Sequence, residues 1–109
     1  TGGALRALAT TGAARADFAP DLPTLAETWP EVVVDAWHGF AAPAGTPDAV
    51  VERLSREIVA VLREPATVAR MRAALLVPAP MDAASFTAFV AEERRRYGTA
   101  VERLGIRVE

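Results

Sequence analysis

The sequence predicts an α/β fold for this chain of 109 residues, with two main strands, one short helix and three longer helices. Two short apolar segments, at about 4–10 and 32–40, have the length and composition of buried strands. After residue 46, apolar side chains instead recur every three or four positions, which is the period of an amphipathic helix. We therefore expect a single α/β domain over residues 1–109.

The first expected strand, residues 4–10, leads into a loop rich in Gly, Ala, Asp and Pro. Thr24 and Glu27 then have the spacing of a capping box, in which the threonine caps the first turn and the glutamate reaches back to the backbone. Pro30 disfavours helical geometry in the residue before it. The pattern predicts a short helix that begins at Thr24 and ends by residue 29.

Three helices are expected in the second half of the chain. The first begins at the N-cap residue Thr46 and ends before Pro65, and a shorter one spans residue 66 to about residue 76. Asp82 is placed to cap the last and longest helix, and Gly105 is placed for a left-handed C-cap. These helices each present one apolar stripe to a core.

Composition excludes several classes of function. The formal net charge is −2 and all twelve basic residues are arginine, so there is no basic excess to neutralise nucleic acid. No cysteine is present, which removes disulfides and thiolate chemistry. No apolar run approaches the roughly 20 residues that cross a bilayer, and the N-terminus lacks a signal-peptide pattern.

Residues that could carry catalysis are scarce. The sequence has no Gly-x-Ser-x-Gly elbow, and in the second expected strand the period of two places His38 and Asp35 on opposite faces. Glu93 interrupts the apolar stripe of the last helix, either because it reaches solvent at the edge of the stripe or because it is a functional carboxylate. We expect no enzyme activity and no metal site.

A binding site is the remaining possibility. In open α/β sheets, ligands lie outside the carboxyl ends of strands. This rule points to Thr10 and Thr11 after the first expected strand and to Trp37, His38 and Gly39 in the second. Hydroxyl groups and free amides there can hold a small anion. The alternative is that the threonines begin a turn, that Trp37 fills the core and that His38 has a structural role.

Four groups of residues stand out by their order along the chain: residues 5–9, 21–27, 37–47, and 86–92 with 105–106. The Pro-Thr-x-x-Glu and Trp-x-Gly…Pro-x-Gly-Thr-Pro elements are the most specific of them. In this order the groups resemble the C-terminal part of the Bug family, the extracytoplasmic solute-binding proteins of tripartite tricarboxylate transporters.

This resemblance implies part of a type II periplasmic-binding-protein fold, in which two lobes close over a small carboxylate ligand. It also implies a periplasmic location, membrane permease subunits as partners and no cofactor. By the same analogy the chain is a C-terminal fragment with pieces of both lobes, without the first-lobe loops that complete the ligand site. The alternative hypothesis is a non-binding structural or self-associating module, with exposed edges that form a homodimer of the fragment.

Overall fold

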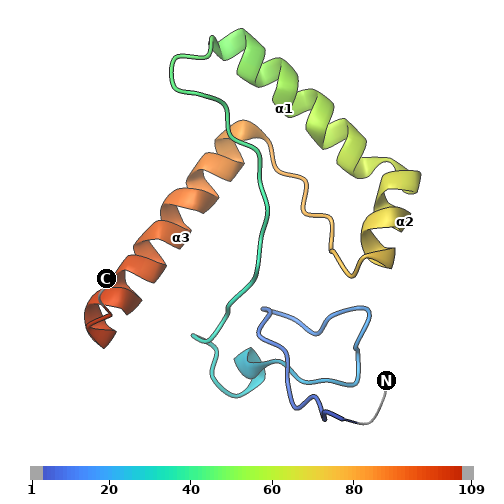
Figure 1. The fold of residues 1–109 in the computed structure, drawn as a ribbon, viewed down its shortest axis with the longest axis vertical. Helices are drawn as coiled ribbons and strands as arrows, with labels where there is room; N and C mark the ends of the chain where they lie inside the picture. Colours follow the sequence, from blue (N-terminus) through green and yellow to red (C-terminus); the bar gives the residue numbers. More distant parts are fainter. Residues whose placement is uncertain (1–3, 107–109) are drawn as a thin grey trace. The chain divides into compact units, whose positions relative to one another are not determined.

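The computed structural model describes residues 4–106, and the chain divides into two compact units, Thr1–Ala41 and Ala42–Glu109. Figure 1 shows that the described part of the N-terminal unit consists of loops with one short helical turn, whereas the C-terminal unit consists of helices and their connections. The three longer helices therefore all lie in the C-terminal unit, and the described part of the N-terminal unit is mostly irregular.

Residues 4–106 contain no β-strand, so the predicted α/β fold class is wrong. Both expected strands, residues 4–10 and 32–40, are irregular except for one bridging residue. That residue is Thr10, which forms an isolated parallel bridge with Thr24. The three expected longer helices are present, so the error concerns the N-terminal unit.

The missing strands have a physical cause. Side-chain packing and backbone pairing with a neighbour stabilise a strand, so apolar or β-branched composition alone does not produce one. Leu5 and Leu8 are 95% and 74% exposed, which shows that the first segment has no packed face. In the second segment, the Val34 amide donates to the Thr11 carbonyl at 2.8 Å, and this single bond does not extend into a ladder.

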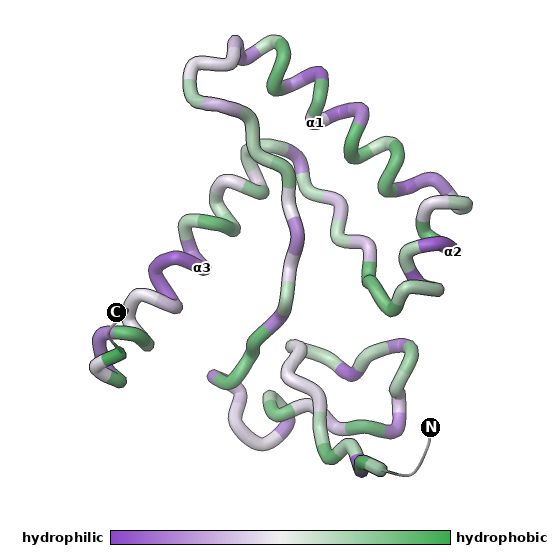
Figure 2. The backbone as a smooth tube through the Cα atoms, in the orientation of Figure 1, coloured by the Kyte–Doolittle hydropathy of each residue, from purple (hydrophilic) through white to green (hydrophobic). Residues whose placement is uncertain are grey.

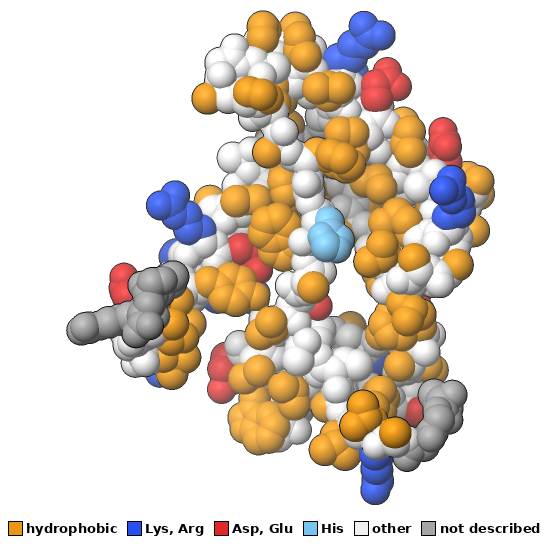
Figure 3. All heavy atoms as spheres, viewed as in Figure 1, with side chains coloured by type: hydrophobic (Ala, Val, Ile, Leu, Met, Phe, Trp, Pro, Cys, Tyr) orange, Lys and Arg blue, Asp and Glu red, His pale blue; other side chains and the backbone are white. Residues whose placement is uncertain are grey.

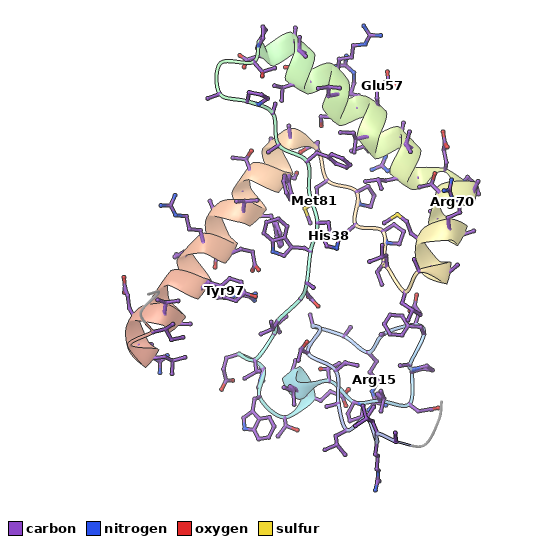
Figure 4. The ribbon with its side chains drawn as sticks, viewed as in Figure 1. Arg15, His38, Glu57, Arg70, Met81 and Tyr97 are labelled. Atoms are coloured by element: carbon purple, nitrogen blue, oxygen red, sulfur yellow. The ribbon has the colours of Figure 1, made fainter. Side chains whose placement is uncertain are left out.

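The predicted short helix exists as a 3-10 turn, η1, at Leu25–Glu27 with Thr24 as its N-cap. The Glu27 carboxylate accepts a hydrogen bond from the Thr24 amide at 3.1 Å, as the capping-box spacing predicts. Arg15 donates through Nε and Nη2 to the two carboxylate oxygens of Glu27, each at 2.8 Å, and through Nη1 to the Pro20 carbonyl at 3.2 Å. This bidentate pair ties the loop to η1, and Figure 4 labels Arg15 within that loop.

Helices α1, Asp48–Arg63, and α2, Pro65–Ala73, confirm two of the three predicted helices. Their boundaries differ slightly from the prediction. Pro47, and not Thr46, occupies the N-cap position of α1, and the Thr46 hydroxyl donates to the Pro43 carbonyl at 2.8 Å. The first residue of α2 is a proline, whose missing N–H costs nothing in a first turn.

The long helix α3, Ala83–Leu104, is confirmed with both of its predicted caps. Asp82 accepts from the Ser85 amide at 2.7 Å, and Gly105 has the left-handed φ of 62° that a C-cap glycine adopts. At 1.5 Å per residue, its 22 residues are about 33 Å long.

Helix α1 contacts both α2 and α3. The Ser55 side chain on α1 accepts a hydrogen bond from the Ala83 amide, the first amide of α3, at 2.9 Å. Glu93 on α3 is only 8% exposed and pairs with Arg96 at 2.9 Å, so it does not reach solvent. The Ser55 contact therefore joins the start of α3 to α1, whereas the Glu93–Arg96 pair lies within α3.

Apolar side chains remain accessible throughout the described residues, where Thr24 and Glu93 are the two buried residues and neither is apolar. Figure 2 shows polar and apolar positions alternating along α1, as expected for an amphipathic helix. Figure 3 shows apolar side chains on the visible surface of both units. No helix within residues 4–106 combines the length and apolar character needed to cross a membrane.

Candidate ligand-binding site

The end of the first expected strand lies between two other segments of the N-terminal unit. The Thr10 amide donates to the Pro23 carbonyl, and the Thr10 carbonyl accepts from the Leu25 amide, each at 2.9 Å. On the next residue, the Thr11 carbonyl accepts from Val34. Three chain segments thus lie side by side, and both the amide and the carbonyl of Thr10 form hydrogen bonds.

Thr11 and its neighbour Gly12 form the accessible part of this arrangement. Thr11 is exposed, and its hydroxyl group makes no hydrogen bond within residues 4–106. A Cβ atom built on Gly12 would lie 3.2 Å from Asp35 Oδ1 and 3.3 Å from the Ala14 carbonyl oxygen. The Asp35 carboxylate therefore lies beside Gly12 and brings a negative charge close to Thr11.

Trp37, His38 and Gly39 lie on the extended segment that continues from Val34. Fully extended chain advances at most about 3.6 Å per residue, so Trp37 can be about 11 Å from Val34 and Gly39 about 18 Å. All three are exposed, and Trp37 at 42% exposure does not fill a core. Figures 3 and 4 show the His38 side chain at the surface. The candidate residues therefore occupy two segments that are joined near Thr11 and spread over an accessible stretch of backbone.

The nearby ion pair does not offer a free cation. Hydrogen bonds, first from the Arg15 side chain and then from the Thr24 amide, lower the pKa of Glu27 to about 2. The same pair raises the pKa of Arg15. Because both guanidinium edges used by Arg15 point at Glu27 and Pro20, its charge is committed to the loop and is not presented to a ligand.

Sequence reasoning missed the contributions of Arg15 and Asp35. The Thr-x-x-Glu spacing identifies Thr24 and Glu27, but no local pattern could have paired Arg15 with a residue twelve positions away. Asp35 approaches Gly12 only because the chain folds back between them. Such contacts are set by loop geometry, which composition and periodicity do not describe.

The groups gathered here form hydrogen bonds. Within residues 4–106, no three His, Cys, Asp or Glu side chains gather where they could hold a metal ion. An exposed hydroxyl group and extended backbone can bind a polar ligand by hydrogen bonds. These groups can therefore donate to or accept from a polar ligand.

The family is established by comparison with known proteins. The sequence profile of the tripartite tricarboxylate transporter family receptor matches residues 1–106. The chain belongs to this family, which confirms the resemblance found in the sequence. The family consists of solute-binding receptors and not of enzymes.

Three relatives illustrate the match. An Agrobacterium vitis protein, the UPF0065 protein in the TAR-I ttuE-ttuC' intergenic region, is 33% identical over 101 residues, which cover 92% of this chain and 28% of the relative. A UPF0065 protein in the tcbD-tcbE intergenic region of a Pseudomonas species is 40% identical over 70 residues, 62% of this chain and 21% of the relative. A UPF0065 protein of Bordetella bronchiseptica is 35% identical over 68 residues, 62% of this chain and 20% of the relative.

The chain spans between 20% and 28% of the length of these relatives. No solved structure matches it significantly. What is established is therefore family membership, and the ligand and the residues that contact it are matters for proposal.

Proposed function

We propose that this chain is part of an extracytoplasmic receptor that binds a small carboxylate in the periplasm and delivers it to the membrane permease subunits of a tripartite tricarboxylate transporter. The observation that carries this proposal is the family match over residues 1–106. In the whole receptor, two lobes close over the ligand, and this chain supplies elements of both. No cofactor is needed for this function.

We assign the ligand site to the five residues that the sequence singles out, four as ligand contacts and Thr10 as a positioning residue. Thr11 offers an exposed hydroxyl group, residues 37–39 offer an accessible backbone, and Trp37 and His38 add exposed side chains. Thr10 has its backbone engaged on both sides, so its role is to hold Thr11 in place. A hydroxyl-to-carboxylate hydrogen bond contributes about 1.5–3 kcal/mol, because one partner is charged.

Asp35 bears on the choice of ligand. Its carboxylate lies beside Gly12, and a ligand carboxylate at Thr11 would be repelled by it. Replacing the charge by Asp35→Asn therefore increases the affinity for a carboxylate, whereas Thr11→Val weakens it by about 10-fold, the equivalent of about 1.4 kcal/mol. Thr99→Val, which removes a hydroxyl group on α3 in the other unit, serves as the matched control.

The experiment is isothermal titration of the purified chain and these three variants with a tricarboxylate, a dicarboxylate and an acidic amino acid. The proposal predicts saturable heat for at least one ligand, lost affinity in Thr11→Val and no change in Thr99→Val. Equal affinities in wild type and Thr11→Val contradict the assigned contact. The absence of saturable heat with all three ligands contradicts a working site in this chain.

A second candidate function is self-association without ligand binding. The observation in its favour is that large apolar side chains on the helices, such as Leu54 and Leu104 at 50% and 73% exposure, are accessible. In the receptor proposal the same side chains contact other parts of a longer protein. Light scattering distinguishes the two functions, because only the second predicts a mass that rises to that of a homodimer with concentration.

A further inference from the structure

A hollow lies at the C-terminal end of α2, in the unit that does not contain Thr11. Its volume is about 320 Å³, and it is partly open to solvent. Four of its lining residues are spaced three and four positions apart along α2 and its C-cap, so they share one face of the helix. The fifth comes from the turn that follows. The lining residues are Thr67, Arg70, Met71, Ala74 and Leu76.

The backbone of that turn holds Leu76 in the wall of the hollow. The Leu76 amide donates to the Met71 carbonyl and the Leu75 amide donates to the Arg72 carbonyl, each at 2.9 Å, which are the two bonds of a Schellman motif. Leu75 has a φ of 59° in this motif, a left-handed conformation that glycine adopts more easily than leucine. The turn therefore brings Leu76 back beside Met71, although leucine is an unfavourable residue for its left-handed position.

Two polar side chains line the hollow from neighbouring turns of α2. The Thr67 hydroxyl group makes no hydrogen bond within residues 4–106, whereas Thr87 and Thr99 on α3 each donate to the carbonyl four residues earlier, at 2.8 and 3.0 Å. Arg70, which Figure 4 labels on α2, is exposed and has no carboxylate partner in the same part of the chain. Residues three positions apart on a helix are neighbours, so both side chains can donate to one anion.

The charge of α2 also favours an anion. The helix contains two arginines, both in its last turn, and no acidic residue, so its side chains carry a charge of +2 in a chain of net charge −2. Arginines at a helix C-terminus ordinarily offset the negative end of the helix dipole. That effect requires no hollow, and it leaves the donors of Arg70 accessible to a ligand.

The remaining lining residues determine the shape of the ligand. Met71, Ala74 and Leu76 provide apolar walls beside the two polar groups. Small-molecule sites of about 300–1,000 Å³ typically combine apolar walls with a few polar groups that orient the ligand, and this hollow is at the lower end of that range. A tricarboxylate would place charged groups against the apolar walls, at a cost in desolvation. A ligand with one carboxylate and an aliphatic chain fits both parts of the lining.

We propose that the α2 hollow binds a monocarboxylate with a short aliphatic chain, with Arg70 and Thr67 donating to the carboxylate and the apolar walls covering the chain. This site is separate from the one at Thr11, which lies in the N-terminal unit. The two sites differ in the ligands they take, so either can fail without the other.

The experiment is an NMR titration of the isotope-labelled chain with octanoate, compared with octan-1-ol and octylamine, which have the same chain length. We expect saturable shifts in the amide signals of residues 67–76 with octanoate, and binding at least about 10-fold weaker for the alcohol and the amine. Equal binding of the three compounds overturns the proposal. Shifts that spread over α1 and α3 without saturation show nonspecific adsorption and also overturn it.

Variants of the lining test the assigned contacts. Arg70→Met keeps an apolar stem without the charge, so it should weaken octanoate binding by at least about 10-fold and leave octan-1-ol binding unchanged. Ala74→Leu fills the hollow and should abolish the binding of both. Arg53→Met, which removes an exposed arginine on α1, is the matched control and should leave octanoate binding unchanged. Equal octanoate affinities in wild type and Arg70→Met overturn the proposal. If a variant loses its helices by circular dichroism, the wild-type comparison of octanoate with octan-1-ol decides.

Discussion

The contact between α1 and α3 depends on the Ser55 side chain, and its removal provides a quantitative test of the C-terminal unit. Ser55 Oγ accepts from the Ala83 amide at 2.9 Å in a partly buried position. The first amides of a helix have no partner inside the helix, so Ser55→Ala leaves the Ala83 N–H without one. A partly buried donor that loses its acceptor costs about 1–2 kcal/mol.

This cost is measurable by urea unfolding followed by circular dichroism. For a chain of this size the dependence of the unfolding free energy on urea is about 1–2 kcal/mol per molar, so we expect the midpoint to fall by about 1 M. Ser55→Thr keeps the acceptor oxygen and should retain most of the stability. Thr99→Ala, which removes a hydroxyl group bonded only within α3, is the control and should change stability by less than about 0.5 kcal/mol. A Ser55→Ala midpoint equal to the wild-type midpoint would refute the junction.

Three further predictions concern pH, the Gly12 contact and the two glycines of α3. The pKa of Glu27 is lowered from 4.5 to about 2, so its contribution to stability is present above pH 4.5 and is lost as the pH falls toward 2. Acid titration of Glu27→Gln should therefore show a shallower loss of stability over this window than the wild type. Identical stability curves for the two proteins would contradict the Arg15–Glu27 pair. Gly12→Ala places a Cβ atom 3.2 Å from Asp35 Oδ1, so the carboxylate must move by a few tenths of an ångström. The NMR signals of Asp35 should therefore shift in this variant. Unshifted signals would contradict the contact between Gly12 and Asp35. Gly98 lies inside α3 with open space around it, so Gly98→Ala should stabilise the chain by about 0.5–1 kcal/mol. Gly105 caps α3 at a φ of 62°, so Gly105→Ala should destabilise the chain by about 1 kcal/mol. Unfolding temperatures that change in the same direction in both variants would contradict this assignment.

The helices could be predicted from the sequence because their signals are local. Asp82 and Gly105 cap α3 where the sequence places them, since each acts within one turn of the helix end. The apolar period of three and four residues identified α1 and α2, with boundaries displaced by a few residues at most. Thr46 is not the N-cap that the sequence predicts, because α1 begins at Asp48 and the N-cap position falls on Pro47.

The strands could not be predicted because a strand depends on pairing partners that are often far away in sequence. The β-branched run at 32–40 has the right composition, but its backbone pairs at Val34 and does not continue into a ladder. For the same reason the resemblance to a sheet-containing fold gave the correct family and the wrong fold class for this chain.

The candidate site was predictable in part. The rule for carboxyl ends of strands selected Thr10 and Thr11, and the structure places both between neighbouring segments even though no strand forms. Their role as ligand contacts stays a prediction. The approach of Asp35 to Gly12 could not be predicted, because it is a tertiary contact between loop residues.

The most direct test of the receptor proposal is an NMR titration of the isotope-labelled chain with a tricarboxylate such as citrate, which reports binding residue by residue. The proposal predicts saturable shifts of the amide signals of Thr11, Gly12 and residues 37–39, with little change in α1 and α3. It also predicts that Thr11→Val weakens these shifts, whereas Thr99→Val leaves them unchanged. Shifts that do not saturate, or that are confined to the helices, would contradict the proposal that this chain carries part of a carboxylate-binding site.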